Sequence, residues 1–143
     1  MRFPHVAAIG ALSLGMTIAL AAPPAPSCKP SGFSFEEAQS LLEATDDLRA
    51  VRRAGDELSI SGSGDGSGDF YYFVVYGAGP RARASADGGL IGYFAVQTAT
   101  GRVFDQGLIQ EVTGTVLGSM QRRLRAEHCV TEAVLNKWND VWP

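Results

Sequence analysis

The sequence predicts an α+β fold: a four-stranded antiparallel meander with N-terminal helices and a C-terminal helix packed on one face. Three observations lead to this prediction. Residues 34–54 carry helix-start signals and apolar residues at helical spacing. Residues 58–105 alternate β-branched or aromatic runs with Gly-rich turns. From Leu108 onward the apolar residues recur every three or four positions, which indicates a helix.

Residues 1–21 are typical of a signal peptide. Arg2 supplies the basic start, an apolar run extends from Val6 to Leu20, and Ala19-Leu20-Ala21 is a small-x-small cleavage pattern. The apolar run is short against the ~20 residues that a membrane-spanning helix needs. We therefore expect cleavage near Ala21, export to the periplasm or the medium, and no transmembrane segment in the mature chain.

The sequence predicts that the mature chain is one acidic domain. Residues 22–32 are rich in Pro, Ser and Gly and predict an extended lead-in, and residues 33–143 have the length of a single α+β domain. The whole chain has a net charge of −3, and removal of Arg2 with the leader makes it more acidic. An acidic balance argues against non-specific binding to nucleic acid or to anionic lipid.

The two cysteines of the sequence are Cys28 and Cys129. In an oxidising compartment such a pair predicts a disulfide. This bond would join the lead-in to the C-terminal segment and close a loop of about 100 residues, which the chain-entropy model values at roughly 4–5 kcal/mol. The alternative is two free thiols, one of them beside His128.

The N-terminal helical region divides into two parts. Ser34 and Glu37 have the spacing of a capping box, and apolar residues at helical spacing follow it. Thr45-Asp46-Asp47 looks like a second N-cap, and the short helix after it stops at Gly55. The pattern therefore predicts a helix, a kink and a second short helix.

Four runs predict strands. They are Leu58–Ser61, residues 70–76, Leu90–Gln97 and residues 102–105. A Gly-Ser-Asp tip at 62–69, a polar loop at 77–89 and a turn at 98–101 connect them, so an antiparallel meander is expected.

The C-terminal third predicts two helices. The apolar stripe from Ile109 to Leu124 indicates a helix, whose start Gly114 could delay to Thr113 or Thr115. Val130, Val134 and Trp138 indicate a last short helix after the cysteine.

The aromatic strand, the run Gly92-Tyr93-Phe94-Ala95-Val96 and the turn Thr100-Gly101-Arg102-Val103 together resemble the strand–turn–strand of PepSY-type and related cystatin-like exported domains. The resemblance covers about residues 34–105. It implies a small binding or inhibitory module, not a catalyst.

No enzyme motif is present in the sequence. The mature chain has one histidine, His128, and its neighbour Cys129 cannot act as a nucleophile if it is in a disulfide. Nucleophile-elbow and phosphate-loop patterns are missing, and one His with two paired Cys does not make a zinc site. A calcium loop starting at Asp65 fails, because Phe70 and Tyr76 stand where Gly and Glu are required. We expect no catalytic residue, no cofactor and no metal.

Charged clusters have simpler explanations than a site. Helix capping and the helix dipole account for Glu36-Glu37 and Asp46-Asp47. The arginine triplets at 49–53 and 122–125 are typical of solvated helix faces, and would suggest anion binding only if they met in space.

The strand at 70–76 is apolar on both faces. Either helices cover both faces, or one face presents aromatic side chains to a partner. In the second case the candidate partner-binding residues lie on two strands and on the loop between them: Tyr72, Tyr76, Arg81, Arg83 and Tyr93.

Two functions of different class follow. The first is an exported protein-binding module, most concretely a periplasmic inhibitor or immunity protein that neutralises an envelope-acting toxin or hydrolase. The alternative is a small-ligand carrier or minor hydrolase with a pocket between the sheet and the C-terminal helix.

Overall fold

The computed structural model describes residues 31–64, 66–79 and 88–143. The predicted signal peptide, Cys28, Asp65, Arg81 and Arg83 lie outside the described residues. The helices and strands, in chain order, are α1 (Phe35–Glu43), α2 (Asp46–Arg53), β1 (Leu58–Ser63), β2 (Phe70–Gly77), β3 (Leu90–Gln97), β4 (Val103–Asp105), β5 (Gln110–Val112), α4 (Thr115–Glu127) and α5 (Glu132–Trp138).

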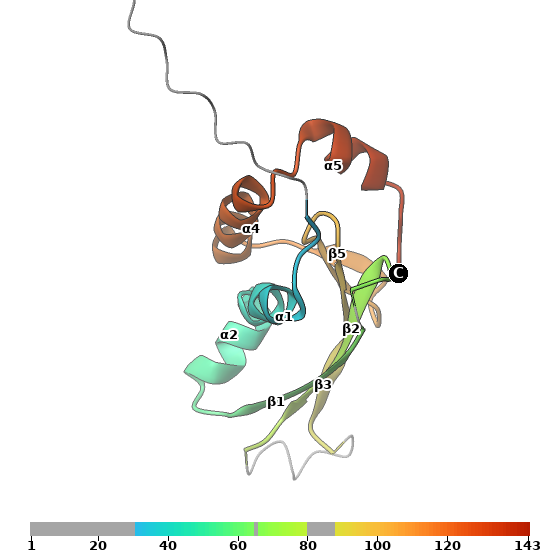
Figure 1. Ribbon diagram of the computed structural model, residues 1–143. Helices are drawn as coiled ribbons and strands as arrows, with labels where there is room; N and C mark the ends of the chain where they lie inside the picture. Colours follow the sequence, from blue (N-terminus) through green and yellow to red (C-terminus); the bar gives the residue numbers. More distant parts are fainter. Residues whose placement is uncertain (1–30, 65, 80–87) are drawn as a thin grey trace, which may run out of the picture.

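The α+β prediction is confirmed, but the sheet has five strands, not four. The strands follow one another in the order β1-β2-β3-β4-β5, and every neighbouring pair is antiparallel (Figure 1). The fifth strand occupies residues that the apolar spacing assigned to a helix. It forms because Val112 pairs with Val103 and Gln110 with Asp105 in a tight hairpin, although the apolar spacing of these residues also fits a helix. The helix begins only at Thr115, after Gly114 in an extended conformation.

The predicted start of the first helix is confirmed in detail. The Ser34 hydroxyl accepts a hydrogen bond from the Glu37 amide at 3.2 Å, and the Glu37 carboxylate accepts from the Ser34 amide at 2.8 Å. Thr45 is the N-cap of α2, as predicted, but its side chain makes no capping hydrogen bond. This hydroxyl is buried without a partner among the described residues.

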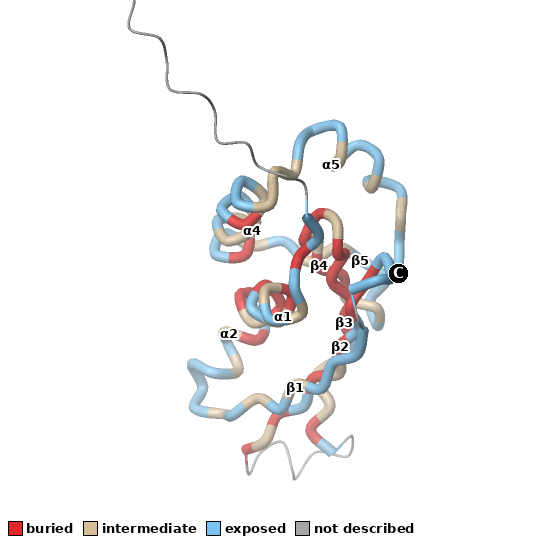
Figure 2. The backbone as a smooth tube through the Cα atoms, viewed as in Figure 1, coloured by how far each residue is buried: buried red, intermediate tan, exposed pale blue. Residues whose placement is uncertain are grey.

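One face of the sheet is packed against α1, α2 and α4 (Figures 1 and 2). From β2, Tyr71, Phe73 and Val75 point into this core. Gly62 lets β1 approach, since a Cβ at this position would lie 2.5 Å from the ring of Phe35. The residues that fill the space between the sheet and the helices include Phe33, Leu41, Leu42, Leu48, Phe94, Val96, Val103, Leu117 and Leu124.

The C-terminal segment crosses to the opposite face of the sheet (Figure 1). There Val141 packs on a second, small cluster of Phe70, Ala95 and Phe104. The buried side-chain amide of Gln97 donates to the carbonyl of Val141 at 3.2 Å and so holds the segment in place. The helix α4 therefore packs on one face as predicted, while α5 leads the chain over to the other.

Candidate protein-binding surface

The outer face of the sheet carries a patch of aromatic side chains, which we call the tyrosine face: Tyr72, Val74 and Tyr76 of β2 and Tyr93 of β3. The exposed fractions are 42% for Tyr72, 39% for Tyr76 and 47% for Tyr93. Val74 pairs directly with Tyr93, so both side chains lie on the same side of the sheet. The structure thus brings together the three tyrosines that the sequence singled out.

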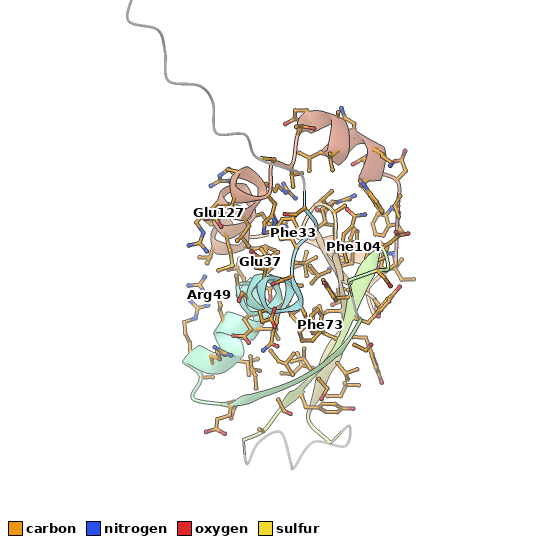
Figure 3. All side chains as sticks on the ribbon, viewed as in Figure 1. Phe33, Glu37, Arg49, Phe73, Phe104 and Glu127 are labelled. Carbon is orange, nitrogen blue, oxygen red and sulfur yellow. The ribbon has the colours of Figure 1, made fainter. Side chains whose placement is uncertain are left out.

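The burial pattern of β2 explains this exposure. Successive residues point to opposite faces, and Tyr71, Phe73 and Val75 occupy the core side. On the other side the C-terminal segment covers the end of the strand at Phe70 and leaves Tyr72 and Tyr76 exposed. Figure 3 shows side chains that project from the sheet on the side away from the helices. Of the two interpretations of this strand, the structure favours the one with an open aromatic face.

The surface around the tyrosine face carries no charge on its strands. The sequences of β1, β2 and β3 contain no Asp, Glu, Lys or Arg, and the exposed side of β1 consists of serines. A shallow groove of about 220 Å³ on these strands is lined by Ser61, Ser63, Tyr72, Tyr93 and Gln106, among others. Depletion of charge and enrichment in tyrosine characterise the centre of protein–protein interfaces.

The structure does not describe the two arginines of the predicted surface. Arg81 and Arg83 belong to the loop between β2 and β3 and lie outside the described residues, so their role stays a prediction. The same holds for the disulfide, because Cys28 lies outside the described residues.

The tip of the β4–β5 hairpin is a surface feature that sequence reasoning missed, because it assigned these residues to a helix. Leu108 is 67% exposed and Ile109 81% exposed. Asp105 shapes the turn, since one carboxylate oxygen accepts from the amides of Gly107 at 2.8 Å and Leu108 at 3.0 Å. Ile109 has a φ of +53°, in the left-handed region. The run Asp-Gln-Gly was the available turn signal.

A second polar cluster joins distant parts of the chain. His128 Nδ1 lies 2.7 Å from the Ser31 hydroxyl, and His128 Nε2 lies 2.7 Å from a Glu37 carboxylate oxygen. The imidazole stacks on Phe33 with ring centroids 4.9 Å apart. Figure 3 labels Glu37 on α1 and Phe33 in the segment before it. His128 is therefore packed against the start of the described chain, and its partners were not predicted from the sequence.

The environment of Glu37 shifts its acidity. Burial acts to raise the pKa of Glu37, but hydrogen bonds from His128 and the Ser34 amide, together with the charge of His128, outweigh it. The pKa of Glu37 therefore lies below its ordinary value of 4.5. The carboxylate is held in its charged form at the junction of α1 and the end of α4.

Several other charged residues have partners within the chain. Asp105 caps the hairpin turn, and Glu111 pairs with Arg102 at 2.6 Å. Arg52 pairs with Glu43 at 2.8 Å, and Arg125 donates to the carbonyl of Thr100 at 2.7 Å. Within residues 31–64, 66–79 and 88–143, no cluster of His, Cys, Asp or Glu could hold a metal ion, and no helix is long and apolar enough to cross a bilayer.

No protein-family model matches the sequence, and no curated protein is similar to it. A chain in the structure of a type VI secretion system effector–immunity complex from Pseudomonas protegens is similar in fold, with a TM-score of 0.55 and 21% sequence identity. The similarity covers 80% of this chain and 91% of that chain. At this identity the likeness shows the fold alone. The resemblance to PepSY-type domains stays a prediction.

Proposed function

We propose that this chain is an exported protein-binding module, a periplasmic inhibitor or immunity protein that neutralises an envelope-acting toxin or hydrolase. The observation that carries the proposal is the tyrosine face. The opposite face of the same sheet is covered by three helices, while this one presents Tyr72, Tyr76 and Tyr93 to solvent.

The chemistry of these side chains favours a protein partner. A single exposed aromatic residue is ordinary, but three tyrosines around Val74 on paired strands make a continuous apolar area. The phenol ring supplies contact area at a small cost in conformational entropy, and the hydroxyl remains hydrated until the partner arrives. The uncharged strands around them remove the desolvation cost that a charged rim would add.

The comparison with solved structures supports the same class of function. A chain of similar fold was solved in a complex of a secreted effector with its immunity protein. This likeness favours a protein partner over a small molecule.

The predicted export of the chain fits the same role. A signal peptide and a Cys28–Cys129 disulfide would place a stable, non-enzymatic domain in the compartment where an envelope-acting toxin works. Binding alone is enough for this task, so neither a cofactor nor a catalytic residue is required.

The test begins with the oxidised mature chain, residues 22–143, as bait for exported proteins of the source cells. The retained protein is purified, and its activity on envelope substrates is titrated with the bait. We expect inhibition to be complete at one equivalent, and periplasmic co-expression to protect cells from the retained protein. A retained protein whose activity is unchanged at saturating bait would contradict the proposal, as would self-association of the chain through the tyrosine face with no other partner.

A second candidate, a small-ligand carrier or minor hydrolase, draws on the cluster of Ser31, His128 and Glu37. Of these residues, Ser31 and His128 line a pocket of about 200 Å³ near the end of α4, together with Thr98 and Val134. The pocket is smaller than the roughly 300–1,000 Å³ of typical ligand sites. The predicted location, between the sheet and α4, is instead filled by Leu117 and Leu124.

The second candidate has its own test. Native mass spectrometry of the purified chain detects a bound small molecule, and a fluorophosphonate probe labels an activated serine. Labelling that disappears in Ser31→Ala, with the fold intact, would favour a hydrolase. We expect neither a bound molecule nor labelling.

A further inference from the structure

The tyrosine face continues onto the β4–β5 hairpin. The Gln106 amide donates to the carbonyl of Tyr93 at 2.9 Å, which fixes the start of the turn against β3. Gln106 also borders both the groove beside Tyr72 and a notch of about 270 Å³ between Ile109 and Trp142. The tyrosines, the hairpin and the C-terminal residues therefore form one continuous surface.

Residues 106–109, which we call the hairpin tip, present two aliphatic side chains to solvent. Leu108 and Ile109 are the most exposed large hydrophobic residues of the described chain. Neither packs against the two apolar clusters found among the described residues. Two adjacent aliphatic side chains at the end of a hairpin form a protrusion that only a complementary surface could bury.

The hairpin tip is also fixed in shape. Asp105 holds the amides of Gly107 and Leu108 through one carboxylate oxygen. Ile109 adopts a φ of +53°, which β-branched residues rarely do and which Gly or Asn would adopt without strain. Strained residues of this kind concentrate at binding sites. A preformed tip binds more tightly, because less conformational entropy is lost when the complex forms.

We propose that the hairpin tip is a hydrophobic plug, in which Leu108 and Ile109 enter an apolar, uncharged depression on the protein partner while Tyr72 and Tyr93 pack against its rim. This inference rests on the proposed function and names the kind of partner that the surface fits. The partner offers a concave site, because this chain supplies the convex element.

The charge around the tip favours a protein over a lipid surface. Residues 103–112 contain no Lys or Arg, and Asp105 and Glu111 are acidic. Loops that insert into bilayers gain from basic residues near anionic headgroups, which this hairpin lacks. We therefore expect a protein partner, and the test includes a measurement that would detect binding to a membrane instead.

The test places a photo-crosslinking amino acid at one position at a time in the full chain, expressed in the source cells. The positions are Leu108, Tyr93 and, as a control, exposed Ala54 beyond the end of α2. We expect positions 108 and 93 to capture the same protein and position 54 to capture none of it. Capture at 93 without capture at 108 would overturn the plug but leave the proposed function standing. Capture at neither position would overturn both.

Substitutions at the tip measure the chemistry of the depression on that captured partner. Leu108→Asp should weaken binding by about 100-fold or more, because it places a charge in an apolar site, whereas Leu108→Met should stay within about fivefold of wild type. Ala50→Asp places the same charge at an exposed position on α2, away from the proposed binding surface, and should leave the affinity unchanged. An equal effect of Ala50→Asp, tolerance of Leu108→Asp, or Leu108-dependent flotation with phosphatidylethanolamine–phosphatidylglycerol vesicles would overturn the proposal.

Discussion

His128 shows how one side chain can hold distant parts of this chain together. Its ring stacks on Phe33 and hydrogen-bonds to Ser31 and Glu37, so it joins the entry of the chain, the first turn of α1 and the end of α4. Glu37 already caps α1 through the Ser34 amide. The carboxylate therefore serves two contacts, and both favour its charged form.

The lowered pKa of Glu37 predicts how stability depends on pH. A carboxyl whose pKa is lower in the folded state contributes stability above its unfolded value, near 4.5, and this contribution disappears as the pH falls through the folded value. Glu37→Gln should therefore be less stable than wild type at pH 7, and the gap should narrow below about pH 4.5. Urea denaturation of both proteins between pH 7 and a pH below 4.5 measures this difference in the free energy of unfolding. A gap that is constant with pH would show that the charge of Glu37 contributes nothing.

The strain at Ile109 also predicts a measurable effect. Ile109→Asn should raise the free energy of unfolding by about 1 kcal/mol, because Asn adopts a positive φ more readily and little burial is lost. Ile109→Asn should also weaken binding to the partner, since it removes an aliphatic contact. Leu108→Asn, at a neighbouring position without a positive φ, is the control and should change stability by less than about 0.5 kcal/mol. Equal stabilisation by both substitutions would contradict the strain argument.

Among the elements, α4 packs against the core along a narrow stripe. Leu117 and Leu124 are buried in the main core, whereas the adjacent Val116 is 38% exposed. Leu117→Ala should cost about 2–5 kcal/mol, because it leaves a cavity beneath the helix. Val116→Ala should change stability by less than about 0.5 kcal/mol. Thermal or urea unfolding compares the two, and similar losses would mean that α4 is turned differently about its axis.

Local signals predicted most of the elements. The capping box at Ser34 and Glu37, the aromatic run of β2 and the turn before Gly101 are encoded within a few residues, and each is found in the structure. Gly101 adopts a φ of +67°, which suits the tight turn between β3 and β4.

Features that depend on distant partners could not be predicted in this way. The strand β5 was missed for a different reason: it forms a hairpin with the preceding strand β4, but the spacing of Ile109, Val112 and Val116 also fits a helix. The partners of His128 are 91 and 97 residues away in the chain. Both faces of β2 are apolar, so only the positions of the helices and the C-terminal segment decide which tyrosines are exposed.

At the scale of the whole molecule, the packing is asymmetric. Three helices cover one face of the sheet, while on the other the C-terminal segment covers only the end near Phe70 and Phe104. Arg102 fastens this segment by donating to the carbonyls of Trp138 at 3.2 Å and Asn139 at 2.8 Å. The remainder of that face is the surface that we assign to a partner.

The predicted disulfide acts at this scale as well. If Cys28 and Cys129 are bonded in the exported chain, reduction should lower the free energy of unfolding by roughly 4–5 kcal/mol in the chain-entropy model. Cys28→Ser with Cys129→Ser should reproduce the loss without reductant. Thiol titration of the unfolded, non-reduced protein checks the bond directly, and two free thiols in protein taken from the periplasm would contradict it.

Calorimetric titration of the purified partner measures whether the tyrosine face is the surface that binds it. Tyr72→Lys with Tyr93→Lys places two charges on this face, and Ala50→Lys with Ala54→Lys places two on the exposed side of the helical layer. We expect the first pair to weaken binding by about 100-fold or more and the second pair to stay within about threefold of wild type. Wild-type affinity in a folded tyrosine variant, or an equal loss in both variants, would contradict this expectation.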